Sequence, residues 1–463
     1  MSGVGAVEVV VPVEATISGE ARRLAGLAWP VVLGQVGLMS MGLVDVLVAG
    51  RAGEHVLAVV GAGRTWSFSL TLLGLGALHG LDPLFAQAWG AGDHARGEQT
   101  LGRGVLLTLL ISAPIAGGHL LAGPGLALLA QPAELIPGAH DYSVIRAIGV
   151  PFVLLYSLLT RYHQGQGRMR LPMLCVVVGN LVNLGLDLSL VQGLTWGPLA
   201  VPALGANGVA MATTAVELSM MVVMAALSGP ALRGAWAARS TLLRAAELRL
   251  VLALCLPVAL QVALEAWAFN VAGLMVGTTG ATALAAHTIA LTLASFTFMV
   301  PLGIGGAAST RVGNLLGAGH RWQRAGWLAV GMAALWMFGC GLGLYTFTTP
   351  ILGLFSSDVA VLAVGATILP IAAAFQLFDG VQASTFGVLR GAGDTRWPSL
   401  ANLLGYWVLG LPLGWVLATR GEMGAVGVWL GLALGLAVVA VLLLLRLWSV
   451  ARSGGTRVVP GPA

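Results

Sequence analysis

The chain has 463 residues, of which 57% are hydrophobic and only 9% are charged, whereas soluble domains carry roughly 25% charged residues. This composition excludes an ordinary soluble protein. All 23 basic residues are arginine. Because they are dispersed at the ends of apolar segments, the formal net charge of +5 does not indicate a nucleic-acid-binding surface.

Hydrophobic runs recur at the length of ~20 residues that an α-helix needs to cross a ~30 Å hydrocarbon core. The weaker alternating pattern of an outer-membrane barrel is absent. The sequence therefore predicts an all-α integral membrane protein embedded in the lipid bilayer. Its twelve expected membrane helices cover residues 24–50, 59–90, 100–122, 142–165, 171–193, 205–228, 247–280, 285–318, 325–348, 364–391, 397–419 and 424–448.

The arginines are distributed unevenly between the two sides of these helices. With a cytoplasmic amino terminus, 19 of the 23 arginines fall in cytoplasmic segments, and only Arg51, Arg64, Arg146 and Arg420 fall outside them. Because cytoplasmic loops carry the excess of positive charge, we expect both termini in the cytoplasm. The Arg-only, Gly- and Ala-rich composition indicates a GC-rich bacterial genome, so we expect a multi-pass protein of the cell inner (plasma) membrane.

Proline and small residues of the first two expected helices recur 227 positions later without a gap. The pairs are Pro30 and Pro257, Gly50 and Gly277, Gly53 and Gly280, and Ala58 and Ala285. Because six helices are an even number, both halves enter the membrane from the same side, as parallel repeats with a cavity between them. We therefore expect two pseudo-symmetric six-helix bundles, with a cytoplasmic amino-terminal segment (1–23), an N-lobe (24–228), a cytoplasmic linker (229–246), a C-lobe (247–448) and a cytoplasmic tail (449–463).

The N-lobe carries two carboxylates inside apolar spans, where an ionisable group is costly unless function retains it. We expect Asp45 near mid-membrane in the first helix. Asn183 and Asp187 are spaced i, i+4 and so share one face of the fifth helix. With a hydroxyl such as that of Thr213, Asp45, Asn183 and Asp187 form a candidate Na⁺ site, because hard cations prefer oxygen ligands. The alternative is a hydrogen-bond cluster that only fixes the lobe.

The C-lobe carries Glu265 in the seventh expected helix and Asp379 in the tenth. Neither helix offers an arginine at membrane depth, and this absence favours uptake of a proton or a cation over a salt bridge. Amide side chains flank both acids and predict a polar wall of the cavity: Gln261, Asn270, Gln376 and Gln382. We add Gln35 and Asp82 of the N-lobe to this expected substrate cavity.

Three further polar positions are weaker candidates. His79 and Asp82 are spaced i, i+3 and could form a carboxylate–imidazole contact. Glu217 and His287 stand as lone polar residues in the sixth and eighth helices, where a structural hydrogen bond is the commoner role. The chain lacks lysine, so it has no phosphate-binding loop of the Gly-Lys-Ser/Thr type and cannot itself drive primary transport with ATP.

Several segments resemble the multidrug and toxic compound extrusion (MATE) family, in the NorM-like branch with some eukaryotic-type features. The matching segments are Met41-Gly42-Leu43-Val44-Asp45, the run from Leu81 to Gly92, the run from Ala285 to Leu291, the run from Arg311 to Gly319, and Phe378-Asp379-Gly380-Val381-Gln382. The resemblance covers about residues 24–448. It implies a secondary antiporter, not an enzyme and without a cofactor, that expels organic, often cationic, drugs in exchange for Na⁺ or H⁺ as two lobes rock between outward-open and inward-open forms.

By position, the resemblance assigns ion or proton coupling to Glu265 and Asp379 in the C-lobe and to Asp45, Asn183, Asp187 and Thr213 in the N-lobe. The chain departs from eukaryotic-type members at Asn270, where they often have a second acid, and from some bacterial members at Phe375, where they have tyrosine. We expect a monomer that binds small molecules and not nucleic acid.

Two other functions stay open. A flippase for lipid-linked sugars, built on a related two-lobed fold, would be expected to line its cavity with arginine or lysine for a pyrophosphate, whereas this chain places arginine at helix ends. A membrane-embedded enzyme would need a metal or nucleophile cluster at one depth, and the eight histidines are scattered.

Overall fold

The computed structural model describes residues 11–196 and 199–459. Twelve helical segments are long and apolar enough to cross a membrane. They are α1 (Ile17–Ala52), α2 (Glu54–His79) continued by α3 (Asp82–Gly90), α4 (His94–Leu120), α6 (Ile136–Gly165), α7 (Arg170–Val191), α8 (Ala206–Leu227), α10 (Ala245–Gly277), α11 (Ala281–Gly317), α12 (Gln323–Thr346), α14 (Val359–Gly391), the segment α15 (Arg396–Asn402), η2 (Leu403–Gly410) and α16 (Leu411–Thr419), and α17 (Gly424–Ser453).

Shorter elements connect these segments. They are α5 (Ala122–Leu128), α9 (Gly229–Ala237), the single turn η1 (Arg239–Thr241), α13 (Thr348–Gly353), and the strands β1 (Leu194–Trp196) and β2 (Leu199–Val201). The two strands pair antiparallel, with Leu194 opposite Val201. This hairpin between α7 and α8 departs from the purely helical expectation, because an apolar span search detects membrane helices and not short strands in their connections.

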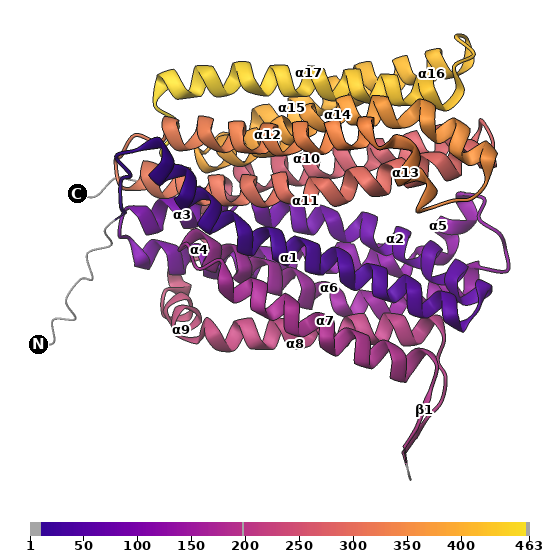
Figure 1. The fold of residues 1–463 in the computed structure, drawn as a ribbon. Coiled ribbons are helices and arrows are strands. Elements are labelled where there is room, and N and C mark those ends of the chain that lie inside the picture. The colour runs from indigo at the N-terminus through magenta and orange to yellow at the C-terminus, as the bar shows by residue number, and fades with distance from the viewer. Residues whose placement is uncertain (1–10, 197–198, 460–463) are drawn as a thin grey trace, which may run out of the picture.

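The helices form two bundles that lie side by side (Figure 1). The N-lobe, from α1 to α8, is indigo to magenta, and the C-lobe, from α10 to α17, is orange to yellow. The start of α1 and the end of α17 lie at the same end of the molecule, which we call the terminal end (Figure 1). The predicted fold class, twelve membrane helices in two pseudo-symmetric bundles of six, is confirmed.

Capping residues extend several helices beyond the apolar runs that the sequence indicates. The Thr16 side chain accepts a hydrogen bond from the Gly19 N–H at the start of α1, which therefore begins at Ile17 and not near residue 24. Asp93 and Asp358 cap α4 and α14 in the same way. A side chain that satisfies the unpaired N–H groups of the first turn lets a helix begin in polar sequence.

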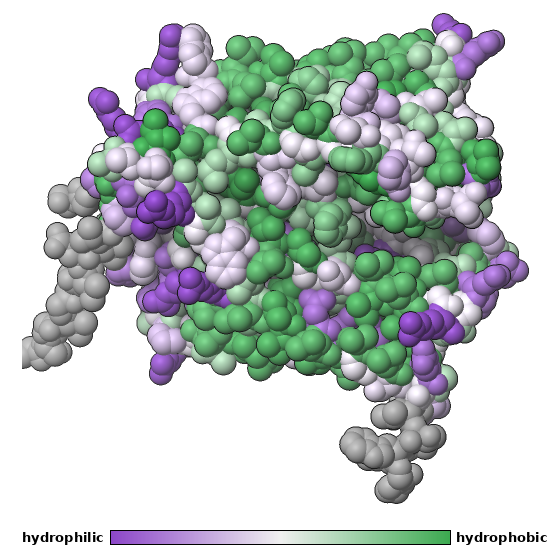
Figure 2. Space-filling model, viewed as in Figure 1, coloured by the Kyte–Doolittle hydropathy of each residue, from purple (hydrophilic) through white to green (hydrophobic). Residues whose placement is uncertain are grey.

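The outer surface of the described part is largely apolar, with large exposed side chains such as Leu181, Leu256 and Leu335. Figure 2 shows this apolar surface over the middle of the helices and polar residues toward both ends. Exposed apolar area of this extent marks a surface that contacts something other than water. Here that surface has the length and composition of membrane-spanning helices.

The lobes contact each other through two symmetry-related helix pairs. α1 packs against α11, and α10 packs against α2, and α10 and α11 are the repeats of α1 and of the segment α2–α3. Glycines allow close approach at the boundary: a Cβ at Gly80 would overlap the backbone of Cys255, and one at Gly317 would overlap the carbonyl of Gln87.

Polar contacts between the lobes lie at one end only. Among the described residues, the inter-lobe bonds include those of Glu20 to Arg311, Asp82 to Arg390, Gln164 to Thr310, Gln87 to Gly391, and Arg96 to Glu247. All of these lie toward the terminal end. At the opposite end the surface is hollowed between the lobes (Figure 2). The described conformation is therefore closed at the terminal end and open at the other.

Candidate functional sites in the two lobes

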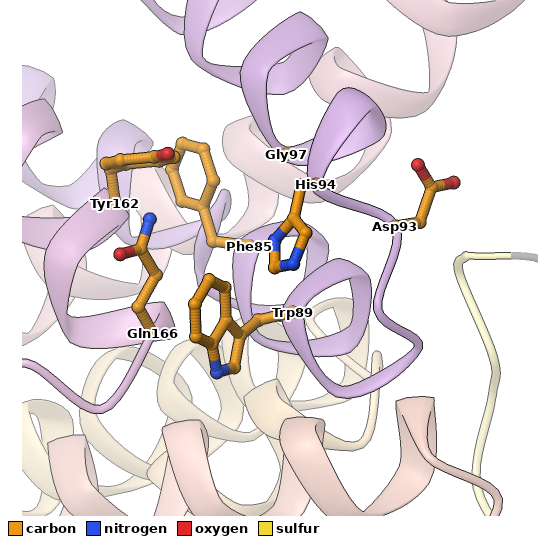
Figure 3. Close-up of a pocket in the computed structure, with 7 residues that line it drawn as sticks. All are labelled: Phe85, Trp89, Asp93, His94, Gly97, Tyr162 and Gln166. Atoms are coloured by element: carbon orange, nitrogen blue, oxygen red, sulfur yellow. The ribbon is translucent and has the colours of Figure 1, made fainter. Parts of the chain in front are cut away.

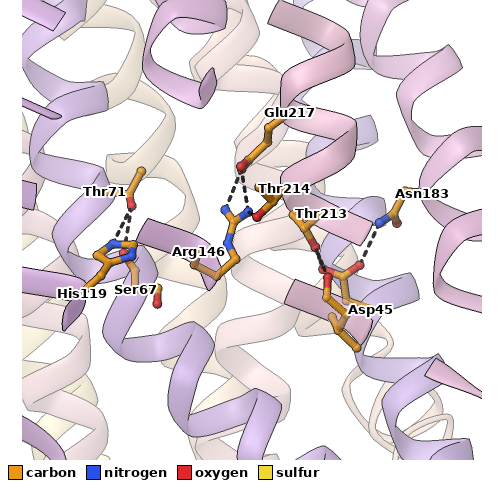
Figure 4. A network of polar contacts seen from close by, with 10 residues as sticks. Asp45, Ser67, Thr71, His119, Arg146, Asn183, Thr213, Thr214 and Glu217 are labelled. Atoms are coloured by element: carbon orange, nitrogen blue, oxygen red, sulfur yellow. Dashed lines mark hydrogen bonds and ion pairs between the residues drawn. The ribbon is translucent and has the colours of Figure 1, made fainter. Parts of the chain in front are cut away.

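The first site centres on Asp45, which lies in the C-terminal third of α1 and is 4% exposed. Its Oδ1 accepts a hydrogen bond of 3.2 Å from Asn183 Nδ2 on α7, and its Oδ2 accepts one of 3.3 Å from Thr213 Oγ1 on α8. Figure 4 shows both side chains directed at the carboxylate from two different helices.

Asp187 completes this cluster and is fully buried. Neither of its carboxylate oxygens has a hydrogen-bond partner within the described part of the chain, and the Oδ1 of Asn183 has none either. Asp187 lies close enough to Asp45 for their charges to act on each other. Buried oxygens without donors are costly, and a proton or a small cation bound here would satisfy them.

The cluster offers the oxygen ligands that a hard cation prefers, but only its two carboxylates carry a charge. Its oxygens come from two carboxylates, one amide and one hydroxyl, which is chemistry that Na⁺ accepts. Within residues 11–196 and 199–459, no group of three or more His, Cys, Asp and Glu side chains is placed to hold a metal ion. The geometry therefore fits a monovalent ion or a proton better than a site for a divalent metal.

An ion pair that the sequence did not indicate lies beside this cluster. Arg146 on α6 makes two bonds to the carboxylate of Glu217 on α8, at 2.7 and 2.6 Å, and a third of 3.2 Å to Thr214 Oγ1 (Figure 4). The interpretation of Glu217 as a lone polar residue is therefore wrong. The two residues are 71 positions apart on different helices, so spacing along one helix gives no sign of the pair.

Arg64 lies one turn from the Asp45 cluster. It lies inside α2, and its Nη1 donates a hydrogen bond of 2.6 Å to the carbonyl of Gly42, one turn before Asp45. A Cβ at position 42 would overlap the guanidinium, so glycine is what admits Arg64. Arg64 and Arg146 both lie inside helices, within the expected spans 59–90 and 142–165.

A small polar network lies farther along the N-lobe (Figure 4). The fully buried His119 of α4 lies 3.2 Å from Thr71 Oγ1, and Ser67 donates 3.2 Å to Ser143. These bonds join α2 to α4 and α6. They satisfy the buried hydroxyls of α2 and contain no carboxylate, so we assign them to packing.

The second site is a chain of hydrogen bonds in the C-lobe that ends on Glu265 of α10. The Tyr406 hydroxyl donates a hydrogen bond of 3.1 Å to Gln382 Oε1. Gln382 Nε2 donates one of 3.4 Å to Asn402 Oδ1, and Asn402 Nδ2 donates one of 3.0 Å to Glu265 Oε2. Every donor points toward the carboxylate, so the chain stabilises its ionised form at that oxygen. The sequence analysis singled out Glu265 and Gln382 but missed Asn402 and Tyr406.

Asn402 and Tyr406 sit where the eleventh membrane segment changes its winding. Asn402 ends α15, and Tyr406 lies in the π-helical stretch η2. Single π-helical turns inside α-helices are often found at functional sites. Close backbone approach of Gly405 to Gly435 of α17 fixes this stretch against its neighbour. Gly and aromatic residues in one apolar run gave no sequence signal for such a turn.

The other predicted C-lobe residues surround this chain in different ways. Asp379 is 5% exposed and has no hydrogen bond to another described residue. Gln376 is fully buried and accepts 3.0 Å from Thr297 Oγ1, while its Nε2 lacks a partner among the described groups. Gln261 accepts at its backbone carbonyl from Asn402 at 3.3 Å. Asn270 is exposed on α10, and Gln35 is partly exposed on α1.

Asp82 is placed at the lobe boundary and not beside His79. Its Oδ2 lies 3.0 Å from Arg390 Nε of the C-lobe and 3.9 Å from Arg161 Nη1. The Nδ1 of His79 instead lies 2.8 Å from the carbonyl of Leu75. The expected carboxylate–imidazole contact is wrong, because arginine from the opposite lobe competes for Asp82. The role of Asp82 as a residue of the substrate cavity stays a prediction.

Figure 3 shows a pocket in the N-lobe where α3 passes into α4. Its walls are mainly aromatic, with ring centroids 5.6 Å apart for Phe85 and Tyr162 and 4.8 Å apart for Trp89 and His94. These edge-to-face contacts pack α3 against α6 and the start of α4. The pocket contains none of the predicted coupling acids, so we assign it to packing.

Comparison with known proteins identifies relatives along nearly the whole chain. The family model described as MatE matches residues 30–188 and again residues 257–416, and the second match begins at the 227-residue offset of the internal repeat. The chain is 35% identical over 442 residues to the multidrug resistance protein NorM of Burkholderia vietnamiensis, covering 93% of this chain and 94% of that protein.

Two further relatives agree with this match. The chain is 32% identical over 456 residues to the multidrug resistance protein PmpM of Pseudomonas aeruginosa, covering 94% of this chain and 93% of that protein. The crystal structure of the eukaryotic MATE transporter AtDTX14 superposes with a TM-score of 0.83 at 22% identity, covering 95% of this chain and 98% of the other. That likeness concerns the fold.

Proposed function

This chain belongs to the MatE family, and we propose that it is a secondary antiporter that exports organic compounds, chiefly cations, in exchange for Na⁺ or H⁺. It is a multi-pass membrane transporter of the multidrug-efflux type and not an enzyme. The proposal concerns the coupling ion, the charge of the substrate and the alternating movement of the lobes.

The observation that carries the proposal is the presence of one buried acid cluster in each lobe. The hydrogen-bond donors to Asp45 and Glu265 are neutral amides and a hydroxyl. These donors leave the negative charge of the carboxylates in place, so each cluster can exchange a proton or a cation.

The two clusters are not copies of each other. At the repeat offset of 227 residues, Ala272 takes the place of Asp45, and Leu38 takes the place of Glu265. The equivalent helices α1 and α10 therefore carry their acids at non-equivalent positions, and the remaining acids Asp187 and Asp379 lie on helices that are not repeats of each other. This asymmetry supports different tasks for the two clusters, with one coupling the ion and the other facing the substrate.

The proposed cycle follows from ligand-dependent populations of two states. The described form is open at the end opposite the terminal end, where bound substrate would leave. Ion or proton binding to an acid cluster would favour release of an organic cation, because like charges compete for the same carboxylates. A ligand shifts such an equilibrium by its differential affinity for the two states, and a few kcal/mol suffice.

The test is efflux of a fluorescent cation such as ethidium from proteoliposomes under an imposed pH or Na⁺ gradient. We compare wild type with Asp45→Asn, Glu265→Gln and Asp379→Asn, and use Glu54→Gln, an exposed acid at the start of α2, as the matched control. Gradient-driven efflux lost in the acid variants and kept in the control supports antiport. Efflux that no gradient changes would overturn it.

The same assay addresses the flippase alternative. Arg146 is neutralised by Glu217, so the cavity side of the N-lobe lacks a free pair of arginines for a pyrophosphate among the residues described.

We also propose that both termini are cytoplasmic in the bacterial plasma membrane. Green fluorescent protein fused after Ala463 should fluoresce, whereas alkaline phosphatase fused there should stay inactive; the reverse would contradict this topology.

A further inference from the structure

The chain does not end with the last membrane helix. After Ser453 it turns back, because Gly454 and Gly455 adopt left-handed φ angles of 87° and 83°. The Gly455 N–H donates 3.1 Å to the Val450 carbonyl, which closes the end of α17. Residues 454–459, which we call the strap, then run across the boundary between the lobes.

The strap is anchored first on the C-lobe. Trp322 Nε1 donates a hydrogen bond of 2.9 Å to the Gly454 carbonyl, and the Thr456 N–H donates one of 3.0 Å to the Ala392 carbonyl. Trp322 is 1% exposed, so its indole is committed to this bond. These contacts hold the beginning of the strap to the ends of α12 and α14.

The strap is then bound by one N-lobe side chain, Gln87 of α3. Gln87 Nε2 donates hydrogen bonds of 3.2 Å to the carbonyls of Thr456 and Gly391. Its Oε1 accepts hydrogen bonds from the N–H groups of Val458 at 2.8 Å and Val459 at 3.4 Å. A glutamine amide has two donor hydrogens and two lone pairs. All four are used on the C-lobe and its strap, and Gln87 is fully buried.

The end of the strap enters a buried apolar cluster that is formed mostly by N-lobe residues and also includes Val251, Leu254 and Cys255 of α10. Val459 is 2% exposed and belongs to the same buried cluster as Leu84 and Phe85, with Val458 packed against that cluster. One covalent segment thus begins on the C-lobe and ends at the lobe boundary, bound to Gln87 of the N-lobe. The lobes cannot separate at this end unless Gln87 and Val459 give up these contacts.

We propose that the strap is a lock that holds the lobes closed at the terminal end, and that its release is a required step before the transporter opens on that side. The lock acts with the buried Glu20–Arg311 pair on the same boundary. This inference rests on the alternating movement proposed above. It is tested by an opening assay that needs no substrate or gradient, so failure of the lock and failure of antiport give different results.

Cys255 provides a native reporter of opening. It is 1% exposed, lies on α10, and packs against Gly80 of α2 across the lobe boundary. The experiment measures alkylation of Cys255 by a water-soluble maleimide in full-length, folded protein that carries Cys175→Ala and Cys340→Ala. A truncation after Ser453 removes the strap, and a truncation after Val459 is the matched control that keeps it.

We expect Cys255 to react about tenfold faster after the truncation at Ser453, since loss of several buried bonds shifts the closed–open equilibrium by at least that factor. The truncation after Val459 should react like the full chain. Equal rates in both truncations would overturn the proposal.

A substitution gives a second measurement in case the shorter chain does not fold. Gln87→Met keeps the volume but removes all four hydrogen bonds to the C-lobe and the strap, and Gln192→Met changes an exposed glutamine. Faster alkylation of Cys255 in Gln87→Met only supports the lock. Unchanged alkylation in a folded Gln87→Met protein counts against it.

Discussion

The guanidinium of Arg311 and the carboxylate of Glu20 face each other across the lobe boundary, with Nε 2.7 Å from Oε1 and Nη2 2.8 Å from Oε2. Both side chains are almost fully buried, and Arg311 also donates 2.9 Å to the Pro12 carbonyl. This paired geometry joins α1 to α11 at the closed end. It places a charged contact where the lobes must separate.

We predict that Arg311→Met destabilises the protein by about 3–5 kcal/mol, because it leaves the Glu20 carboxylate buried without its partner. The double variant Glu20→Met/Arg311→Met should lose less, since it removes both charges. Thermal unfolding in detergent measures the effect, with Arg22→Met as an exposed control. A double variant less stable than Arg311→Met would contradict the assignment of a buried ion pair.

Thr213→Val should alter coupling without unfolding the N-lobe. It removes the hydroxyl that donates to Asp45 Oδ2 but keeps the shape of the side chain, and a lost hydrogen bond to a charged group costs about 1.5–3 kcal/mol. If Na⁺ is the coupling ion, the Na⁺ concentration needed for half-maximal efflux should rise about tenfold or more. If H⁺ is the coupling ion, the H⁺ concentration should fall, because a carboxylate that loses a donor holds a proton more tightly. The control is Thr288→Val, an exposed threonine of α11; an equal effect there would sink the prediction.

The hydrogen-bond chain in the C-lobe predicts a graded series of variants. Asn402→Leu removes the donor to Glu265, Gln382→Leu removes the link before it, and Tyr406→Phe removes only the first link. We expect the half-saturating substrate concentration to change most in Asn402→Leu, and by less than about tenfold in Tyr406→Phe. Efflux kinetics in proteoliposomes give this order, and a larger effect of Tyr406→Phe than of Asn402→Leu would refute it.

Close packing of α14 on α11 predicts a strong effect of one methyl group. In Gly387→Ala the new Cβ would overlap the backbone of Gly305, and overpacking of this kind costs about 1–3 kcal/mol. Gly339→Ala on α12 meets open space and should be neutral or stabilise the helix by about 0.5–1 kcal/mol. Thermal unfolding of the two variants separates these outcomes, and equal stabilities would argue against the close approach.

Much of the architecture could be predicted from local properties. Apolar runs of membrane length indicated the helices, and the recurrence of Pro30 at Pro257 indicated the two repeated halves. Both signals are local in sequence, or depend on a comparison of the chain with itself. The start of α1 at Ile17 was missed because a cap, and not hydrophobicity, begins that helix.

In the candidate sites, the acids could be predicted from the sequence, but their hydrogen-bond and ion-pair partners could not. Asp45 and Glu265 could be singled out because an acid inside an apolar run is conspicuous. Arg146 could not be assigned to Glu217, nor Asn402 to Glu265, because these partners lie on different helices and their pairing depends on helix rotation. The expected contact of Asp82 with His79 failed for the same reason, since Arg390 comes from the other lobe.

The sequence by itself determined the membrane helices, their duplication and which acids lie inside those helices, because hydrophobicity and repeat spacing act along the chain. Only the tertiary structure decided which donors meet each acid, which lobe end is closed, and that Gln87 holds the strap. Those contacts depend on how helices distant in sequence rotate and pack. A hydrogen bond forms only within about 3.5 Å, and no residue spacing along one helix sets the distance between side chains of two helices.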